Sequence, residues 1–174
     1  MTALNRANIE VLVQLKELVT CCQSIYCRTH SSSGAAIGEH VRHVLDHYRA
    51  FQAGMLSECI DYNYRTRNSI EETDPLIALK HIDALIEWLA SDALMPANIQ
   101  VISEINLQYS QSETMLSTPT RELLYLINHS IHHMAYAALL AKTNGLTVPT
   151  HIGLSPGTAS YLRSTQEDPS YASN

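Results

Sequence analysis

The sequence predicts an all-α protein: a four-helix bundle with a long crossover and an irregular or short β connection before the fourth helix. Three observations support this fold class. Apolar residues recur with helical period over four long segments, two of these segments begin with a capping residue followed by proline, and histidines cluster on two of them. Metal sites in helical bundles are formed by side chains on facing helices, so the clustered histidines also indicate a metal site.

The first two helices are indicated by their periodic apolar residues. We expect the first at residues 2–28 and the second at residues 37–59, separated by a loop rich in serine and glycine. The segment 61–73 that follows is polar and rich in turn-forming residues. It is therefore expected to be a surface crossover.

The third and fourth helices are indicated by their ends. Asp74-Pro75 places a capping residue before a proline at the first helical position, and this helix should reach about residue 90. Thr118-Pro119 begins the fourth helix in the same way, and Asn144-Gly145 ends it. Between them, alternation over residues 98–109 and 113–116 predicts a short hairpin or an extended connection. We expect one domain over residues 1–165 and a flexible polar tail at 166–174.

Composition excludes several classes of function. A net charge of −6 without a clustered basic surface argues against a nucleic-acid partner. No apolar run approaches the roughly 18 residues that cross a bilayer, and the amino terminus lacks the pattern of a signal peptide, so we expect a cytoplasmic protein with no membrane partner. The four cysteines form no C-x-x-C pair and are better interpreted as small apolar residues than as disulfides.

Six of the nine histidines lie in two helical clusters. His129 and His133 are four residues apart and therefore project from one face of the fourth helix, where both imidazoles can reach one ion. The second helix carries His40, His43 and His47, of which His43 is the best candidate for a third ligand. A single H-x-x-x-H pattern is often a surface feature, and a lone histidine is more often a satisfied core residue. The two clusters together predict a site formed by three histidines.

The same residues resemble a known family. The run from Gly38 to His47 contains a histidine followed by two apolar residues and an acid, and it is similar to the second-helix motif of the DinB/YfiT-like superfamily. The run from His129 to His133 resembles the fourth-helix H-x-x-x-H motif of that family. The likeness extends to residues 121–124, 62–72 and 153–158. A tryptophan that often precedes the second helix is missing, and Ala36-Ile37 stands in its region.

This resemblance implies a four-helix bundle that binds one divalent metal ion, commonly zinc, nickel or iron, often as a homodimer. Matched position by position, the family's ligands fall on His43, His129 and His133. Related proteins include transferases and isomerases that use low-molecular-weight thiols such as bacillithiol or mycothiol. Membership of a family does not by itself select a reaction.

Three neutral imidazoles leave coordination positions free, which is typical of a catalytic metal site. We therefore expect a metal-dependent enzyme of the thiol-transferase or hydrolase type, with His47, His132 or Asp46 as candidates for a catalytic base. The alternative is a non-catalytic bundle in which the metal only stabilises the fold. Such a protein would act as a dimerisation or stress-response module. An oxygen-handling di-iron bundle would need paired Glu-x-x-His motifs, which the sequence does not provide.

Two further expectations concern partners. Tyr and Arg side chains in the crossover could bind an anionic group of a small-molecule substrate, although an exposed arginine in a loop is more often only solvated; these residues are Tyr62, Tyr64, Arg65 and Arg67. Apolar residues outside the main stripe of their helices suggest an exposed face for homodimer formation; these are Leu12, Leu85 and Trp88.

Overall fold

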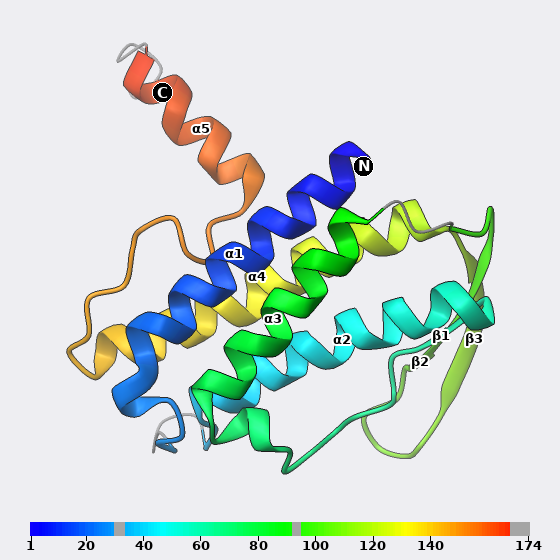
Figure 1. The fold of residues 1–174 in the computed structure, drawn as a ribbon, viewed down its shortest axis with the longest axis horizontal. Coiled ribbons are helices and arrows are strands. Elements are labelled where there is room, and N and C mark those ends of the chain that lie inside the picture. Colours follow the sequence, from blue (N-terminus) through cyan, green and yellow to red (C-terminus); the bar gives the residue numbers. More distant parts are fainter. Residues whose placement is uncertain (30–33, 92–94, 168–174) are drawn as a thin grey trace.

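The computed structural model describes residues 1–29, 34–91 and 95–167. Within these ranges the chain forms the helices α1 (Ala3–Cys22), α2 (Ile37–Ser57), α3 (Pro75–Ala90), α4 (Pro119–Thr143) and α5 (Pro156–Glu167). Helix α1 packs against α3 and α4, and α2 packs against α4 and α3. Figure 1 shows α1 to α4 side by side, with α5 projecting away from them. The predicted mostly helical architecture is confirmed.

Local capping explains where three of the helices begin. The side chain of Asp74 accepts hydrogen bonds from the backbone N–H groups of Leu76 and Ile77 at 2.9 and 3.3 Å. Thr118 accepts from the N–H of Arg121 at 3.2 Å, and Thr2 accepts from that of Asn5 at 3.1 Å. Each cap satisfies N–H groups that have no partner within the helix. The predicted starts of α3 and α4 are confirmed.

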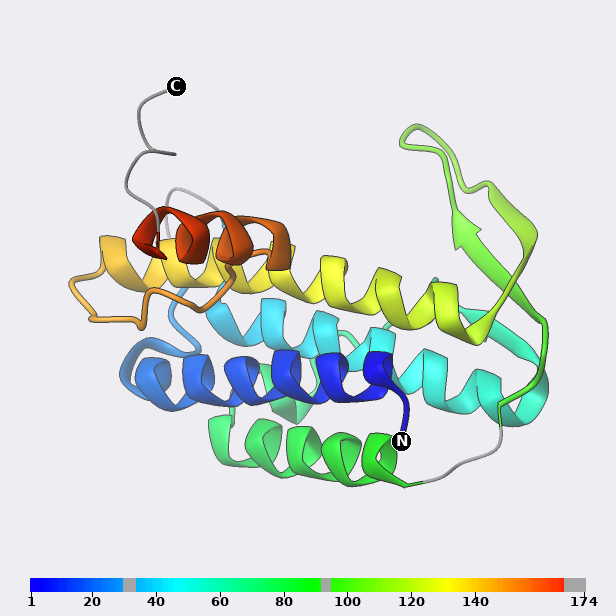
Figure 2. The same cartoon turned by 90° about the horizontal axis from the view of Figure 1, so that it is seen from above.

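A small sheet lies at the end of the bundle where α2 finishes and α4 begins (Figure 2). Its strands are β1 (Cys59–Asp61), β2 (Ile99–Glu104) and β3 (Ser112–Ser117), in the order β1-β2-β3. Strand β1 pairs with β2 in parallel, Ile60 opposite Val101, and β2 pairs with β3 antiparallel. The predicted hairpin is confirmed as β2 and β3. The all-α class was wrong in this respect, because a three-residue strand such as β1 is too short to show alternation.

Helix α5 is a second departure from the prediction. Pro156 occupies its first position, and the hydroxyl of Ser155 accepts a hydrogen bond from the N–H of Thr158 at 3.2 Å. This is the same signal that marks α3 and α4, but the density of proline and glycine before it obscured the pattern. The helix extends to Glu167, and the rest of the expected tail, residues 168–174, lies outside the described residues.

The core is apolar but also contains buried polar contacts, and Asn8 makes two of them. The amide of Asn8, fully buried, donates to the carbonyl oxygen of Leu123 on α4 at 3.1 Å and accepts from the hydroxyl of Tyr48 on α2 at 2.8 Å. Asn8 thereby links α1 to both helices that carry the histidines. Leu12 and Leu85, expected on an exposed dimer face, are 0% and 4% exposed, so that surface was wrongly placed.

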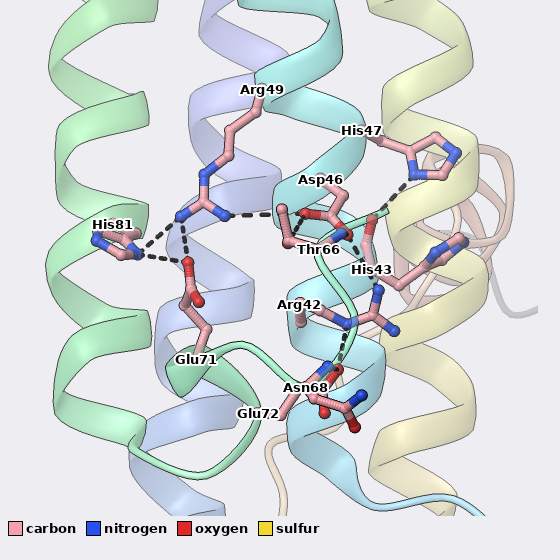
Figure 3. A network of polar contacts seen from close by, with 10 residues as sticks. All are labelled: Arg42, His43, Asp46, His47, Arg49, Thr66, Asn68, Glu71, Glu72 and His81. Atoms are coloured by element: carbon pink, nitrogen blue, oxygen red, sulfur yellow. Dashed lines mark hydrogen bonds and ion pairs between the residues drawn. The ribbon is translucent and has the colours of Figure 1, made fainter. Parts of the chain in front are cut away.

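The crossover between β1 and α3 is fastened to α2 by charged residues (Figure 3). The carboxylate of Asp46 accepts from the N–H of Thr66 at 3.1 Å and from its hydroxyl at 2.5 Å, and also from Arg42 at 3.0 Å. Arg42 lies 2.6 Å from a carboxylate oxygen of Glu72. A buried carboxylate with several donors is firmly held, so these contacts fix the crossover beside the histidines of α2.

A second group of charged residues joins the crossover to α3. Arg49 of α2 and His81 of α3 both contact the carboxylate of Glu71, at 2.5 and 2.9 Å (Figure 3). Burial raises the pKa of Glu71, but hydrogen bonds from Ser69, its own backbone and Arg49 outweigh burial and lower it to about 2.

All four cysteines are free, and no helix in the described part of the chain is long and apolar enough to span a membrane.

Candidate metal centre

Three histidines from α2 and α4 converge at one point. Each of His43, His129 and His133 offers a ring nitrogen, and these three atoms all lie within 4.8 Å of one another. The Nε2 atoms of His43 and His129 are 3.0 Å apart. The ring centroid of His133 lies 4.4 Å from that of His43 and 4.6 Å from that of His129. The trio expected from helix periodicity is thus brought together by the fold.

Helix packing produces this convergence. His43 lies on the buried face of α2 and is 9% exposed. On α4, Ser130 and Met134 each follow one of the other two histidines and are buried, at 1% and 0% exposure. Burial of these neighbours fixes the rotation of α4 about its axis, and both imidazoles are directed toward α2. The half-buried position of His129 and His133 leaves one side of the cluster accessible.

The spacing fits a divalent ion. Two nitrogen ligands of a tetrahedral zinc ion, each at about 2.05 Å from the metal, lie roughly 3.3 Å apart. The separation of 3.0 Å between the Nε2 atoms of His43 and His129 is close to this value. The third nitrogen, from His133, lies within 4.8 Å of the other two. Among the described residues, the group of possible ligands contains these three side chains and no cysteine or carboxylate.

The protonation of the cluster also suits a metal. Burial, together with the neighbouring His47, His133, Arg65 and His129, lowers the pKa of His43 to about 2. Burial likewise lowers the pKa values of His129 and His133 to about 3, with contributions from nearby histidines and from Arg65. At neutral pH all three imidazoles are uncharged. Each therefore has one ring nitrogen with a lone pair, the form of imidazole that coordinates a metal ion.

His47 lies beside the trio but outside it. Its ring stacks on that of His129 at a centroid distance of 4.0 Å and on that of Tyr62 at 5.1 Å. Its Nδ1 is 2.9 Å from the carbonyl oxygen of His43, and since a carbonyl only accepts, Nδ1 carries the proton. The Nε2 atom of His47 is left with a lone pair. Burial lowers the pKa of His47 to about 4, although the hydrogen bond to the carbonyl opposes this.

The other two candidates for a catalytic base occupy different surroundings. The carboxylate of Asp46 is engaged by Thr66 and Arg42 in the contacts that fasten the crossover. His132 is exposed, and its ring centroid lies 5.2 Å from that of His133. Of the three candidates, His47 is the one whose ring packs against two histidines of the trio, His43 and His129.

The sequence prediction gave no role to His40 or Tyr125, which line the site. His40 places its Nδ1 3.2 Å from the Nδ1 of His133, and its ring lies 5.0 Å from that of Tyr136. The ring of Tyr125 stacks on His129 at 5.4 Å. Tyr125 precedes His129 by one helical turn, so the periodicity used for the histidines would also have identified it.

Arg65 is the crossover residue that reaches the histidines. Its Nη1 lies 2.8 Å from the Nδ1 of His43. The sequence prediction included Arg65 only within a group of crossover residues suited to an anion. No local pattern distinguishes it from Arg67, because its position depends on the contact between Asp46 and Thr66 that fixes the crossover.

Comparison with known proteins agrees with this geometry. Residues 23–156 match the model of the DinB family, a span that includes all three histidines. The chain is also similar to FK506-binding protein 5 of Rhizopus delemar, with 27% identity over 106 residues. That stretch covers 60% of this chain but only 28% of the length of the relative. No solved structure matches the chain. Since the family match covers most of its length, the chain belongs to the DinB family.

Proposed function

We propose that His43, His129 and His133 bind one divalent metal ion and that the protein is a metal-dependent enzyme of the thiol-transferase or hydrolase type. The observation that carries this proposal is the convergence of three neutral imidazoles with no fourth ligand in the group, among the residues described. Three-histidine sites leave a position for water or substrate, whereas structural sites are closed by four protein ligands.

The protein's own groups suit such chemistry. A bound divalent ion would lower the pKa of a coordinated water or thiol. The proton released needs an acceptor, and the Nε2 lone pair of His47 is available because its Nδ1 donates to the backbone. The rings of Tyr62 and Tyr125 contact His47 and His129, so they restrict water on that side of the cluster.

Cobalt substitution tests whether the site is open. Cobalt(II) absorbs visible light with a spectrum that depends on its ligands. Addition of millimolar 2-mercaptoethanol should produce a thiolate-to-cobalt band in the wild type and in His132→Gln, whose exposed ring lies outside the trio. The His43→Ala variant should show no band because it has lost a ligand. A cobalt spectrum that thiol leaves unchanged would contradict an open site.

Turnover is tested separately with a general electrophile. If the protein activates thiols, the metal-loaded form should accelerate the reaction of 2-mercaptoethanol with 1-chloro-2,4-dinitrobenzene, and His47→Gln should lower the rate while retaining the metal. General base catalysis contributes roughly 100- to 10,000-fold, so a loss of at least tenfold is expected if His47 is the base. Equal rates in the two proteins would remove His47 from this role.

The alternative function is a non-catalytic bundle stabilised by the metal. It is favoured by the fact that the three ligands come from two helices, which an ion would cross-link. This alternative predicts a large rise in melting temperature on metal binding together with a cobalt spectrum that is insensitive to thiol. An open site predicts that thiol changes the spectrum.

Assembly and metal identity are proposed on the family resemblance, and the location is proposed on the composition of the sequence. We propose zinc, nickel or iron as the ion, a low-molecular-weight thiol as a co-substrate, a homodimer as the assembly and the cytoplasm as the location. Exposed apolar side chains on α4, Leu124 and Leu139, support an apolar contact between two copies. Light scattering at micromolar concentration should give twice the chain mass of 19.4 kDa. A mass near 19.4 kDa would contradict the dimer.

A further inference from the structure

Arg65 binds a histidine of the candidate metal site by hydrogen bonding. Its Nη1 lies 2.8 Å from the Nδ1 of His43, and a guanidinium can only donate, so this nitrogen of His43 accepts. The proton of His43 must then be on Nε2, where it can be donated to the Nε2 of His129 at 3.0 Å. The two contacts are consistent with a single tautomer of His43.

Metal binding is incompatible with this contact. A neutral imidazole has one nitrogen with a lone pair and one that carries a proton. If an ion binds the Nε2 of His43, the proton must be on Nδ1, which then presents an N–H to the N–H of Arg65. If an ion binds Nδ1 instead, it takes the lone pair that Arg65 uses. In both cases the guanidinium of Arg65 loses its acceptor.

The backbone beside Arg65 is held in place when the guanidinium is released. The next residue, Thr66, is held on Asp46 by both its N–H and its hydroxyl, at 3.1 and 2.5 Å. No carboxylate is in contact with Arg65 among the described residues. The carboxylate of Asp46 is already engaged, and that of Glu122 accepts from Tyr62 and other donors. Among the described residues Arg65 therefore has no carboxylate in direct contact, and the charge of Asp46 acts on it only from a distance.

The charge of a loaded site would favour an anion. The histidines are neutral, so an ion and Arg65 together place three positive charges in a small volume. The positive charge of Arg65 contributes to the lowered pKa values of His43, His47, His129 and His133, and its guanidinium contacts the ring of His43. Arg65 is also exposed, so a solute can reach it. Guanidinium and carboxylate form paired hydrogen bonds of matching geometry.

We propose that Arg65 leaves His43 when the metal binds and then holds a carboxylate of the small-molecule substrate next to the ion. This inference rests on the metal site of the proposed function. It names the substrate class as a molecule with a carboxylate placed a short distance from the atom that binds the metal.

Metal affinity tests the first half of the proposal. Apo protein is titrated with zinc in competition with a chromophoric chelator, for the wild type, Arg65→Met and the matched control Arg67→Met. Arg67 lies two residues along the same crossover, is exposed and makes no hydrogen bond to a histidine among the described residues. Loss of a charge-assisted hydrogen bond that competes with the ion should tighten zinc binding about tenfold in Arg65→Met. An affinity equal to that of Arg67→Met would overturn the competition.

Ligand selectivity tests the second half. Mercaptoacetate and 2-mercaptoethanol both carry a thiol on a two-carbon chain, but only the first has a carboxylate. The cobalt-substituted wild type and Arg67→Met should bind mercaptoacetate at least tenfold more tightly than 2-mercaptoethanol. Arg65→Met should bind the two thiols equally. A preference for mercaptoacetate that survives in Arg65→Met would assign the carboxylate to another group and overturn the role of Arg65.

Failure of the metal site and failure of the role of Arg65 would give different results. If zinc does not bind the wild type or Arg65→Met, the metal site itself is refuted, and the role of Arg65 is refuted with it. If zinc binds with one ion per chain but neither affinity nor selectivity depends on Arg65, the metal site stands and only the present inference is lost.

Discussion

The hydroxyl of Tyr62 offers a sharp test of the packing beside the histidines. It donates to a carboxylate oxygen of Glu122 at 3.0 Å, and both side chains are buried. Burial raises the pKa of Tyr62 above its ordinary range, and the charge of Glu122 raises it further, so the hydroxyl is a donor at neutral pH. The other oxygen of Glu122 accepts from Ser117 and Arg121, at 2.5 and 3.0 Å.

Replacing Tyr62 by phenylalanine removes only this donor. The stacked ring against His47 is retained, and one buried carboxylate oxygen of Glu122 loses its partner. A hydrogen bond to a charged group contributes about 1.5–3 kcal/mol, so Tyr62→Phe should lower the free energy of unfolding by about 2 kcal/mol. With an m-value of about 2 kcal/mol/M, the midpoint of urea unfolding should fall by about 1 M.

Tyr64 provides the matched control for this experiment. It lies in the same crossover, is 70% exposed and makes no side-chain hydrogen bond to another described residue. Tyr64→Phe should change the free energy of unfolding by less than about 0.5 kcal/mol. Equal midpoints for the two variants would refute the account of Glu122 as a carboxylate that depends on Tyr62.

Two further predictions concern the stability of the metal-free protein. The pKa of His47 is lowered from 6.5 to about 4 in the folded protein, so on acidification the unfolded chain takes up a proton at this residue before the folded chain does. The contribution of neutral His47 to the free energy of unfolding is therefore complete above pH 6.5 and is lost between pH 6.5 and 4. At pH 5 the loss for this residue is about 2 kcal/mol. Urea unfolding at pH 7.5 and 5 should show this loss, and His47→Gln should reduce it; pH-independent stability would contradict the burial of a neutral imidazole. Gly38→Ala should lower the free energy of unfolding by about 1–3 kcal/mol, because the added Cβ would overlap the carbonyl oxygen of Glu72 and approach the ring of Tyr26 to 2.8 Å. The control Gly157→Ala, whose added Cβ meets no atom within 4 Å, should leave the melting temperature unchanged.

Local chemistry determined which parts of the fold could be predicted. The starts of α3 and α4 follow from Asp74-Pro75 and Thr118-Pro119, because a cap and the proline after it act within one turn. The strand β1 could not be predicted, since its three residues are stabilised by pairing with residues about 40 positions further along the chain. Long-range pairing leaves little trace in a short window of sequence.

The same distinction applies to the site. His129 and His133 share a face by helical periodicity alone, and His43 joins them because α2 packs on α4. The contact of Arg65 with His43 depends on Asp46 and Thr66, which are 20 residues apart. When the position of a side chain depends on a contact between residues far apart in the sequence, the sequence alone does not distinguish that side chain from a solvated one.

The metal content of the protein tests the central claim most directly. The chain is purified without a nickel column, loaded with zinc, desalted and measured by elemental analysis, in parallel with a His129→Ala, His133→Ala double variant whose helical content is checked by circular dichroism. The account predicts one ion per wild-type chain and almost none in the folded double variant, because one imidazole alone does not hold a divalent ion. One ion per chain retained by the double variant would contradict the site.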